Sequence, residues 1–142
     1  MRSMEYLERR VLFDGMEYLL NGRPYVPMMD VDAIMDCHGK AWLVYECKYG
    51  DSLPPVGQKS TIERMIDNFT RGGRHAAALI CSHGDEDPVY LRDCIVTGIY
   101  TTGAGWRYQG VDYSEKLTAK EFTDTYLQQH APEMLIKKGE IL

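Results

Sequence analysis

The segment from Ala41 to Lys48 places the strongest constraint on the fold. Its residues alternate between two faces: Trp42, Val44, Glu46, Lys48 on one and Ala41, Leu43, Tyr45, Cys47 on the other. Because both faces carry apolar residues, the pattern predicts a central strand that is covered on both sides. Glu46 and Lys48 lie at one end of this strand, where burial of a charge is costly unless the charge is paired.

Further strands and a helix are predicted on either side of this segment. Polarity alternates from Met28 to Met35, and a short turn predicts that this stretch pairs antiparallel with 41–48. Ser60 and Glu63 have the spacing of a capping box, and the apolar residues that follow predict a helix near Ser60 to Arg71. His75 to Ser82 is predicted to be another buried strand.

The remaining segments complete an alternating pattern of strands and helices. Two apolar runs, Val11 to Phe13 and Met16 to Leu20, flank Asp14-Gly15 and predict a strand hairpin, and Asn21-Gly22 predicts a second turn. Shorter strands are predicted at Asp93 to Tyr100 and Trp106 to Tyr108, and a second capping box, Thr118 to Glu121, opens a helix. This order predicts an α/β fold with a mixed β-sheet flanked by helices.

The composition suits one domain that spans residues 1–142. The chain has 142 residues, 44% hydrophobic and 26% charged residues, and a net charge of −5. No apolar run is long enough for a membrane helix, and charged residues interrupt Met1 to Leu20, so we expect a cytoplasmic protein without a signal peptide. A strongly basic surface for nucleic acid is not evident.

The four cysteines are expected to be reduced, because they form no CxxC pair and no export signal precedes them. A zinc site from Cys37, His38, Cys81 and His83 is an alternative, but this spacing fits no usual pair of zinc ligands.

Two carboxylates are predicted to converge at the end of the central strand. The antiparallel pairing brings Asp30 or Asp32 close to Glu46, and Lys48 shares the face of Glu46. Neighbouring carboxylates repel unless they share a cation, and oxygen ligands of this kind suit Mg²⁺ or Mn²⁺. We choose Asp32, because the apolar run 33–35 follows it.

Asp32 followed by Glu46-Cys47-Lys48 resembles the signature of the PD-(D/E)XK nuclease superfamily. The only ExK of the chain ends the predicted central strand, and Gln58 resembles the glutamine that several branches carry after it. The likeness covers about residues 28–82 and is greatest to small endonuclease-like proteins of phages and prophages. It implies a restriction-endonuclease-like core and a Mg²⁺-dependent endonuclease that hydrolyses phosphodiester bonds of DNA.

The resemblance also implies roles for individual residues. Asp32, Glu46 and the Cys47 carbonyl would hold Mg²⁺ or Mn²⁺, Lys48 would position the attacking water, and Gln58 would orient its neighbours. The leading proline-aspartate pair is degenerate, and Cys47 stands where the family has an aliphatic or small residue. A further glutamate of many relatives could correspond to Glu5, Glu8 or Glu17.

The sequence is also compatible with other interpretations. Glu46 and Lys48 could be a half-buried pair beside a solvated Asp32, or the fold could serve as an inactive binding or inhibitory module for a protein partner, consistent with its acidity. Another metal- or nucleotide-dependent enzyme is least favoured, since no glycine-rich phosphate loop is present. For a nuclease, Trp106-Arg107-Tyr108 could stack on bases, His83 could add a contact, and a homodimer or larger nucleoprotein complex is expected.

Overall fold

The computed structural model describes residues 18–20, 23–26 and 30–135, which belong to two compact units, Met1–Asp30 and Val31–Leu142. In the first unit, strand β1 (Tyr18–Leu20) pairs antiparallel with β2 (Arg23–Val26). The predicted hairpin at Asp14-Gly15 and the three glutamates Glu5, Glu8 and Glu17 lie outside the described residues.

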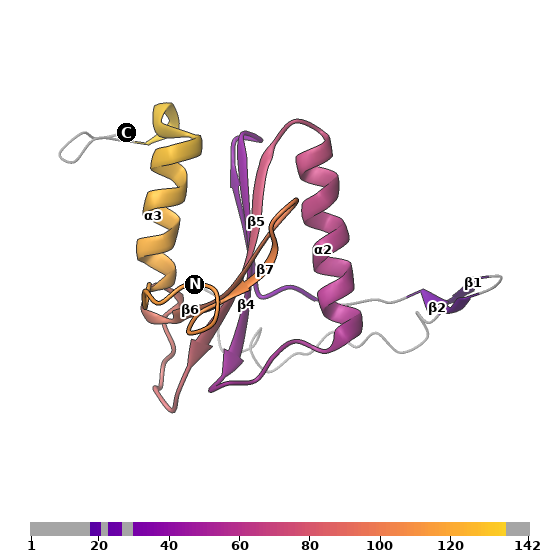
Figure 1. Ribbon diagram of the computed structural model, residues 1–142, viewed down its shortest axis with the longest axis horizontal. Helices are drawn as coiled ribbons and strands as arrows, with labels where there is room; N and C mark the ends of the chain where they lie inside the picture. Colours follow the sequence, from indigo (N-terminus) through magenta and orange to yellow (C-terminus); the bar gives the residue numbers. More distant parts are fainter. Residues whose placement is uncertain (1–17, 21–22, 27–29, 136–142) are drawn as a thin grey trace, which may run out of the picture. The chain divides into compact units, whose positions relative to one another are not determined.

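The second unit contains a five-stranded sheet in the order β3-β4-β5-β6-β7 (Figure 1). The strands are β3 (Ala33–Cys37), β4 (Ala41–Tyr49), β5 (His75–His83), β6 (Ile95–Thr101) and β7 (Gly105–Tyr108). β4 and β5 are parallel, and the other neighbours are antiparallel. The predicted mixed sheet is therefore confirmed, as is the antiparallel pairing of β3 with β4.

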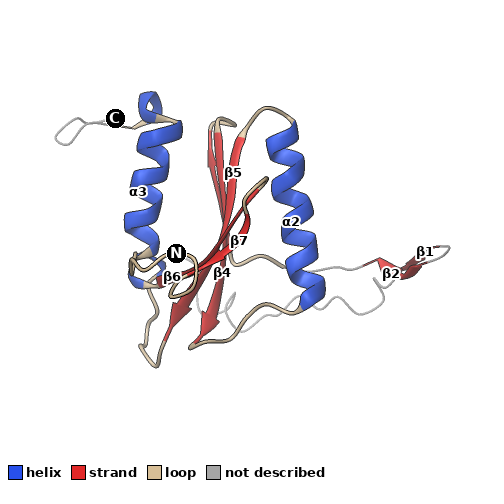
Figure 2. Ribbon diagram, viewed as in Figure 1, coloured by secondary structure: helices blue, strands red, loops and turns tan. Residues whose placement is uncertain are grey.

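Two helices cover opposite faces of this sheet (Figure 2). Helix α2 (Val56–Arg71) connects the parallel strands β4 and β5, and α3 (Ala119–His130) follows β7. Phe69 of α2 stacks on Trp42, with ring centroids 4.7 Å apart, and the Tyr45 hydroxyl on the opposite face hydrogen-bonds Thr123 of α3 at 2.8 Å. Short 3₁₀ turns occur at Leu91–Asp93 and Pro132–Met134.

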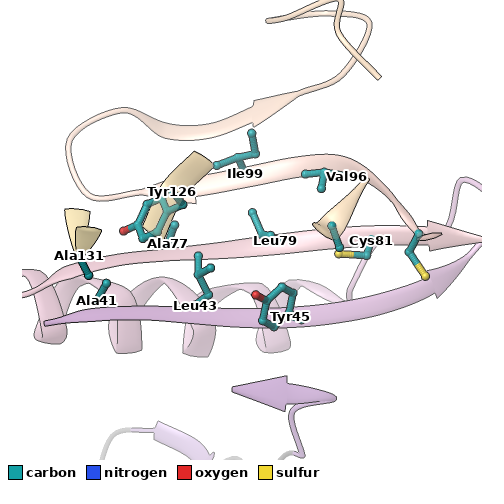
Figure 3. Packing of buried hydrophobic residues seen from close by; sticks show 12 residues of the cluster. Ala41, Leu43, Tyr45, Ala77, Leu79, Cys81, Val96, Ile99, Tyr126 and Ala131 are labelled. Atoms are coloured by element: carbon teal, nitrogen blue, oxygen red, sulfur yellow. The ribbon is translucent and has the colours of Figure 1, made fainter. Parts of the chain in front are cut away.

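The core on the α3 side is built from alternate residues of the central strands (Figure 3). Leu43, Tyr45, Leu79 and Val96 are buried there beside Tyr126 of α3. On the other side, apolar residues of α2 pack against the face that carries Glu46, and Ile62 and Ile66 are fully buried. No helix of the described residues is long and apolar enough to cross a membrane.

Two predicted boundaries are wrong. The strand predicted at 28–35 begins at Ala33, because the Asp32 side chain rather than its backbone accepts the hydrogen bond from the Cys47 amide. The helix predicted from Ser60 begins at Val56, since the Pro55 carbonyl already accepts the first helical hydrogen bond, from the Lys59 amide at 2.9 Å.

Candidate functional site

The candidate site lies where β4 ends, beside the start of β3. The last paired residues of these strands are Ala33 and Tyr45, so Asp32 and Glu46 are the next residues outward on adjacent strands. Residues opposite each other in an antiparallel pair project to the same face. Asp32 and Glu46 therefore share the face that α2 covers, and Lys48 follows Glu46 on that face two residues later.

Asp32 is held by the backbone of the neighbouring strand. Its Oδ2 accepts a hydrogen bond of 2.6 Å from the Cys47 amide. Because a charge-assisted bond of this length fixes the carboxylate next to Glu46, the site brings two negative groups together before any ligand binds. Asp30, the other candidate, is exposed and is the last residue of the first unit.

Lys48 links the two sides of the site. Its Nζ lies 3.4 Å from Glu46 Oε2 and donates a long hydrogen bond of 3.5 Å to Gln58 Oε1. Gln58 stands in the first turn of α2, which begins earlier than the sequence predicted and so places this amide beside the end of β4. The structure thus brings Asp32, Glu46, Lys48 and Gln58 together.

Glu46 is the most unusual residue of the group. Only 3% of it is exposed, and its Oε1 is buried without a hydrogen-bond partner in the described structure. Burial raises the pKa of the carboxyl above its ordinary value; the charge of Asp32 adds to the increase, and Lys48 opposes it. A single ammonium on Oε2 leaves the other oxygen without a positive partner.

The donor set fits a hard cation with few protein ligands. Within the described residues, no group of three or more His, Cys, Asp or Glu side chains could hold a metal, so Asp32 and Glu46 would act as a pair of carboxylates. Mg²⁺ is commonly bound through one or two carboxylates, with water and substrate phosphate as the remaining ligands. Burial raises the pKa of the Cys47 thiol to about 11, so its sulfur stays protonated and only its carbonyl suits such an ion.

Two other sequence-based candidates are not brought to this site. His83 pairs in register with Tyr49, not Lys48; the Tyr49 and His83 rings contact edge to face, and His83 Nδ1 lies 3.0 Å from the Gly84 carbonyl. The proposed zinc set is also separated: Cys37 is paired at the beginning of β4, whereas Cys81 is paired near its end. The zinc alternative is therefore wrong.

Sequence reasoning missed a connection from the site to the far edge of the sheet. Lys59, the residue after Gln58, donates a 2.7 Å hydrogen bond to the Tyr108 hydroxyl and lies over the rings of Trp106 and Tyr108. The Trp106 indole in turn donates to Glu63 of α2 at 2.7 Å. These contacts anchor α2 against β7 and engage Trp106 and Tyr108, which the sequence suggested as residues that stack on bases.

No family model, curated protein or solved structure matches this chain. The geometry of the site and the motif formed by Asp32 and Glu46-Cys47-Lys48 are therefore the features that indicate a function.

Proposed function

We propose that this protein is a metal-dependent nuclease with a restriction-endonuclease-like core that hydrolyses phosphodiester bonds of DNA. The observation that carries the proposal is the buried Glu46 carboxylate, which stands beside Asp32 and Lys48 and has one oxygen without a partner. A metal ion would supply the missing positive charge. The order of hairpin β3–β4, helix α2 and parallel strand β5 also agrees with the order expected from the resemblance.

The residues of the site have distinct roles in this proposal. Asp32, Glu46 and the Cys47 carbonyl would hold Mg²⁺ or Mn²⁺, which supplies a water of lowered pKa and neutralises phosphate charge. The Lys48 ammonium positions the water and stabilises the negative charge that develops on the phosphate. Gln58 accepts a hydrogen bond from Lys48 and so orients its ammonium.

The test compares wild type with Glu46→Ala and with Glu115→Gln, an exposed carboxylate far along the chain from the site. The three proteins are purified identically and assayed on linear, nicked, branched and single-stranded DNA with Mg²⁺, and again with EDTA. We expect wild type and Glu115→Gln to cleave only with the metal, and Glu46→Ala to be inactive. Calorimetry with Mn²⁺ should show a saturable site that Glu46→Ala abolishes.

Two outcomes contradict the proposal. Equal cleavage by wild type and Glu46→Ala identifies a contaminating nuclease. An absence of both cleavage and Mn²⁺ binding in wild type favours a module that binds a protein partner.

A further inference from the structure

A polar pocket of about 440 Å³ lies at the opposite end of the sheet from the candidate site. Every side chain that lines it belongs to a basic residue type: His38, Lys40, Arg74, His75 and His130; two glycines complete the lining. Lys40, the residue before β4, and Lys48 are eight residues apart, so the two sites are about 26 Å apart at about 3.3 Å per residue.

The fold explains why these residues gather. β4 and β5 are parallel and begin at the same end of the sheet, where the His75 amide donates to the Lys40 carbonyl at 3.2 Å. Arg74 lies between the end of α2 and the first residue of β5, and His130 is the last residue of α3. Three separate segments, namely the turn before β4, the junction of α2 with β5 and the end of α3, therefore contribute basic side chains to one pocket.

These basic groups have few acidic partners, although the whole chain has a net charge of −5. Lys40 forms an ion pair with Glu133, and the Asp36 carboxylate in the adjacent turn accepts a hydrogen bond from the Gly39 amide at 2.6 Å. Among the described residues, the Arg74 guanidinium makes no ion pair or hydrogen bond. A positive group is thus available to a ligand.

Two of the histidines that line the pocket pack against each other. The rings of His75 and His130 are stacked, with their centroids 4.2 Å apart. The centroid of the Tyr126 ring lies 4.5 Å from that of His130. Burial, and then the proximity of His75, lower the pKa of His130. The negative end of the α3 dipole favours a protonated histidine there but repels anions, so binding depends on the side chains.

A second, smaller cavity of about 210 Å³ shares part of the lining of this pocket. Arg74, His75 and His130 line it, together with Thr70 of α2, Thr101 at the end of β6 and Thr102 in the following turn. Arg74, His75 and His130 therefore border both cavities. The Thr102 hydroxyl already donates to Asp67 at 2.6 Å, so the hydroxyls of Thr70 and Thr101 are the additional donors nearby.

We propose that this pocket binds a divalent oxyanion of the phosphate type through Arg74, Lys40 and the doubly protonated pair His75–His130. The anion would be the negatively charged partner of the guanidinium and of the two protonated imidazoles. Each protonated ring donates a charge-assisted hydrogen bond to it. Binding therefore tightens as the histidines gain protons. Glu133 and Asp36 are the carboxylates that compete with the anion, and His38 adds a third titratable ring. The proposal does not depend on nuclease activity.

The experiment titrates the whole protein with sulfate, which stays a dianion throughout, in chloride buffers at about pH 5.5 and about pH 8, on either side of the ordinary histidine pKa. We expect binding at least about tenfold tighter at the lower pH, because protonated imidazoles attract a dianion. Arg74→Gln should weaken binding at least about tenfold by removal of a bidentate donor. Arg71→Gln, an exposed arginine of α2 that does not line the pocket, is the matched control and should bind as wild type.

The source of the phosphate group is resolved by competition. A nucleic-acid end is the ligand if an oligonucleotide duplex with a 5′ phosphate displaces sulfate and the same duplex without that phosphate does not. If inorganic phosphate alone competes, the ligand is a free anion. Absence of saturable sulfate binding, equal binding at both pH values, or binding unchanged in Arg74→Gln overturns the proposal. Circular dichroism establishes that each variant is folded.

Discussion

The Glu46 carboxylate occupies a position that costs the folded protein free energy. It is almost fully buried, a second carboxylate stands beside it, and one of its oxygens has no partner. Residues kept in such unfavourable surroundings often serve a function, because a fold selected for stability alone would replace them.

This reasoning predicts that Glu46→Gln stabilises the protein while it removes activity. The neutral amide is less costly to bury than an ionised carboxylate, so the free energy of unfolding should rise by about 1 kcal/mol. Urea denaturation with EDTA present measures the change. Glu115→Gln should stay within about 0.5 kcal/mol of wild type, as expected for an exposed position. A clear loss of stability in Glu46→Gln would mean that the Lys48 pair outweighs the burial cost.

A second prediction at this scale separates Lys48 from Gln58. Lys48→Ala should lower kcat by about 100-fold or more, two tenfold steps of about 1.4 kcal/mol each, because its charge acts chiefly in the transition state. Gln58→Ala should cost less, since Gln58 contacts Lys48 only through a long bond of 3.5 Å. Steady-state cleavage of DNA gives kcat and KM for each variant, with Lys116→Ala as an exposed control. An effect of Lys48→Ala on KM alone would assign it to substrate binding.

At the scale of elements, the sequence predicted those helices and strands whose formation depends on local patterns of polarity and capping. β4 and β5 were recognisable because both of their faces are apolar, and α3 because Thr118 and Glu121 form a capping box in which each side chain bonds the backbone of the other. The start of β3 was missed because a side chain, Asp32, replaces backbone pairing there. The start of α2 was missed because Pro55 begins the helix without a capping side chain.

The same distinction holds for the site. The proximity of Asp32 to Glu46 follows from the register across a short turn, which a sequence can indicate. The near-complete burial of Glu46 and the link from Lys59 to Tyr108 depend on how α2 packs across the sheet, which no local pattern determines.

The capping box of α3 gives a prediction for this scale. The Thr118 hydroxyl accepts a hydrogen bond from the Glu121 amide at 3.1 Å, so Thr118→Ala should reduce the free energy of unfolding by about 1 kcal/mol. Thr125→Ala, the same change at an exposed position within α3, should have little effect. Urea denaturation compares the two variants; equal losses would show that the hydroxyl at Thr118 contributes nothing specific as a cap.

For the whole molecule, the half-buried His130 of α3 predicts how stability depends on pH. The folded pKa of His130 is lowered from the ordinary value of 6.5, so the unfolded chain binds more protons between the two values. Stability is therefore retained above about pH 6.5 and is lost as the pH falls through this window. The Tm of wild type should fall more than that of His130→Gln when oxyanion-free buffer is changed from about pH 7.5 to about pH 5.5. Identical decreases would contradict this role of His130.

The charge of the whole molecule predicts a metal requirement for binding DNA as well as for cleavage. A net charge of −5 opposes a polyanion, and two of the negative groups stand together at the proposed contact with phosphate. Ca²⁺ should allow DNA binding without efficient cleavage, because its longer and looser coordination activates water less well. We expect fluorescence anisotropy with a labelled duplex to show at least about tenfold tighter binding in Ca²⁺ than in EDTA, which corresponds to about 1.4 kcal/mol. Glu46→Ala should lose this gain and Glu115→Gln should keep it; equal affinity of wild type in Ca²⁺ and EDTA would place the DNA contact elsewhere on the protein.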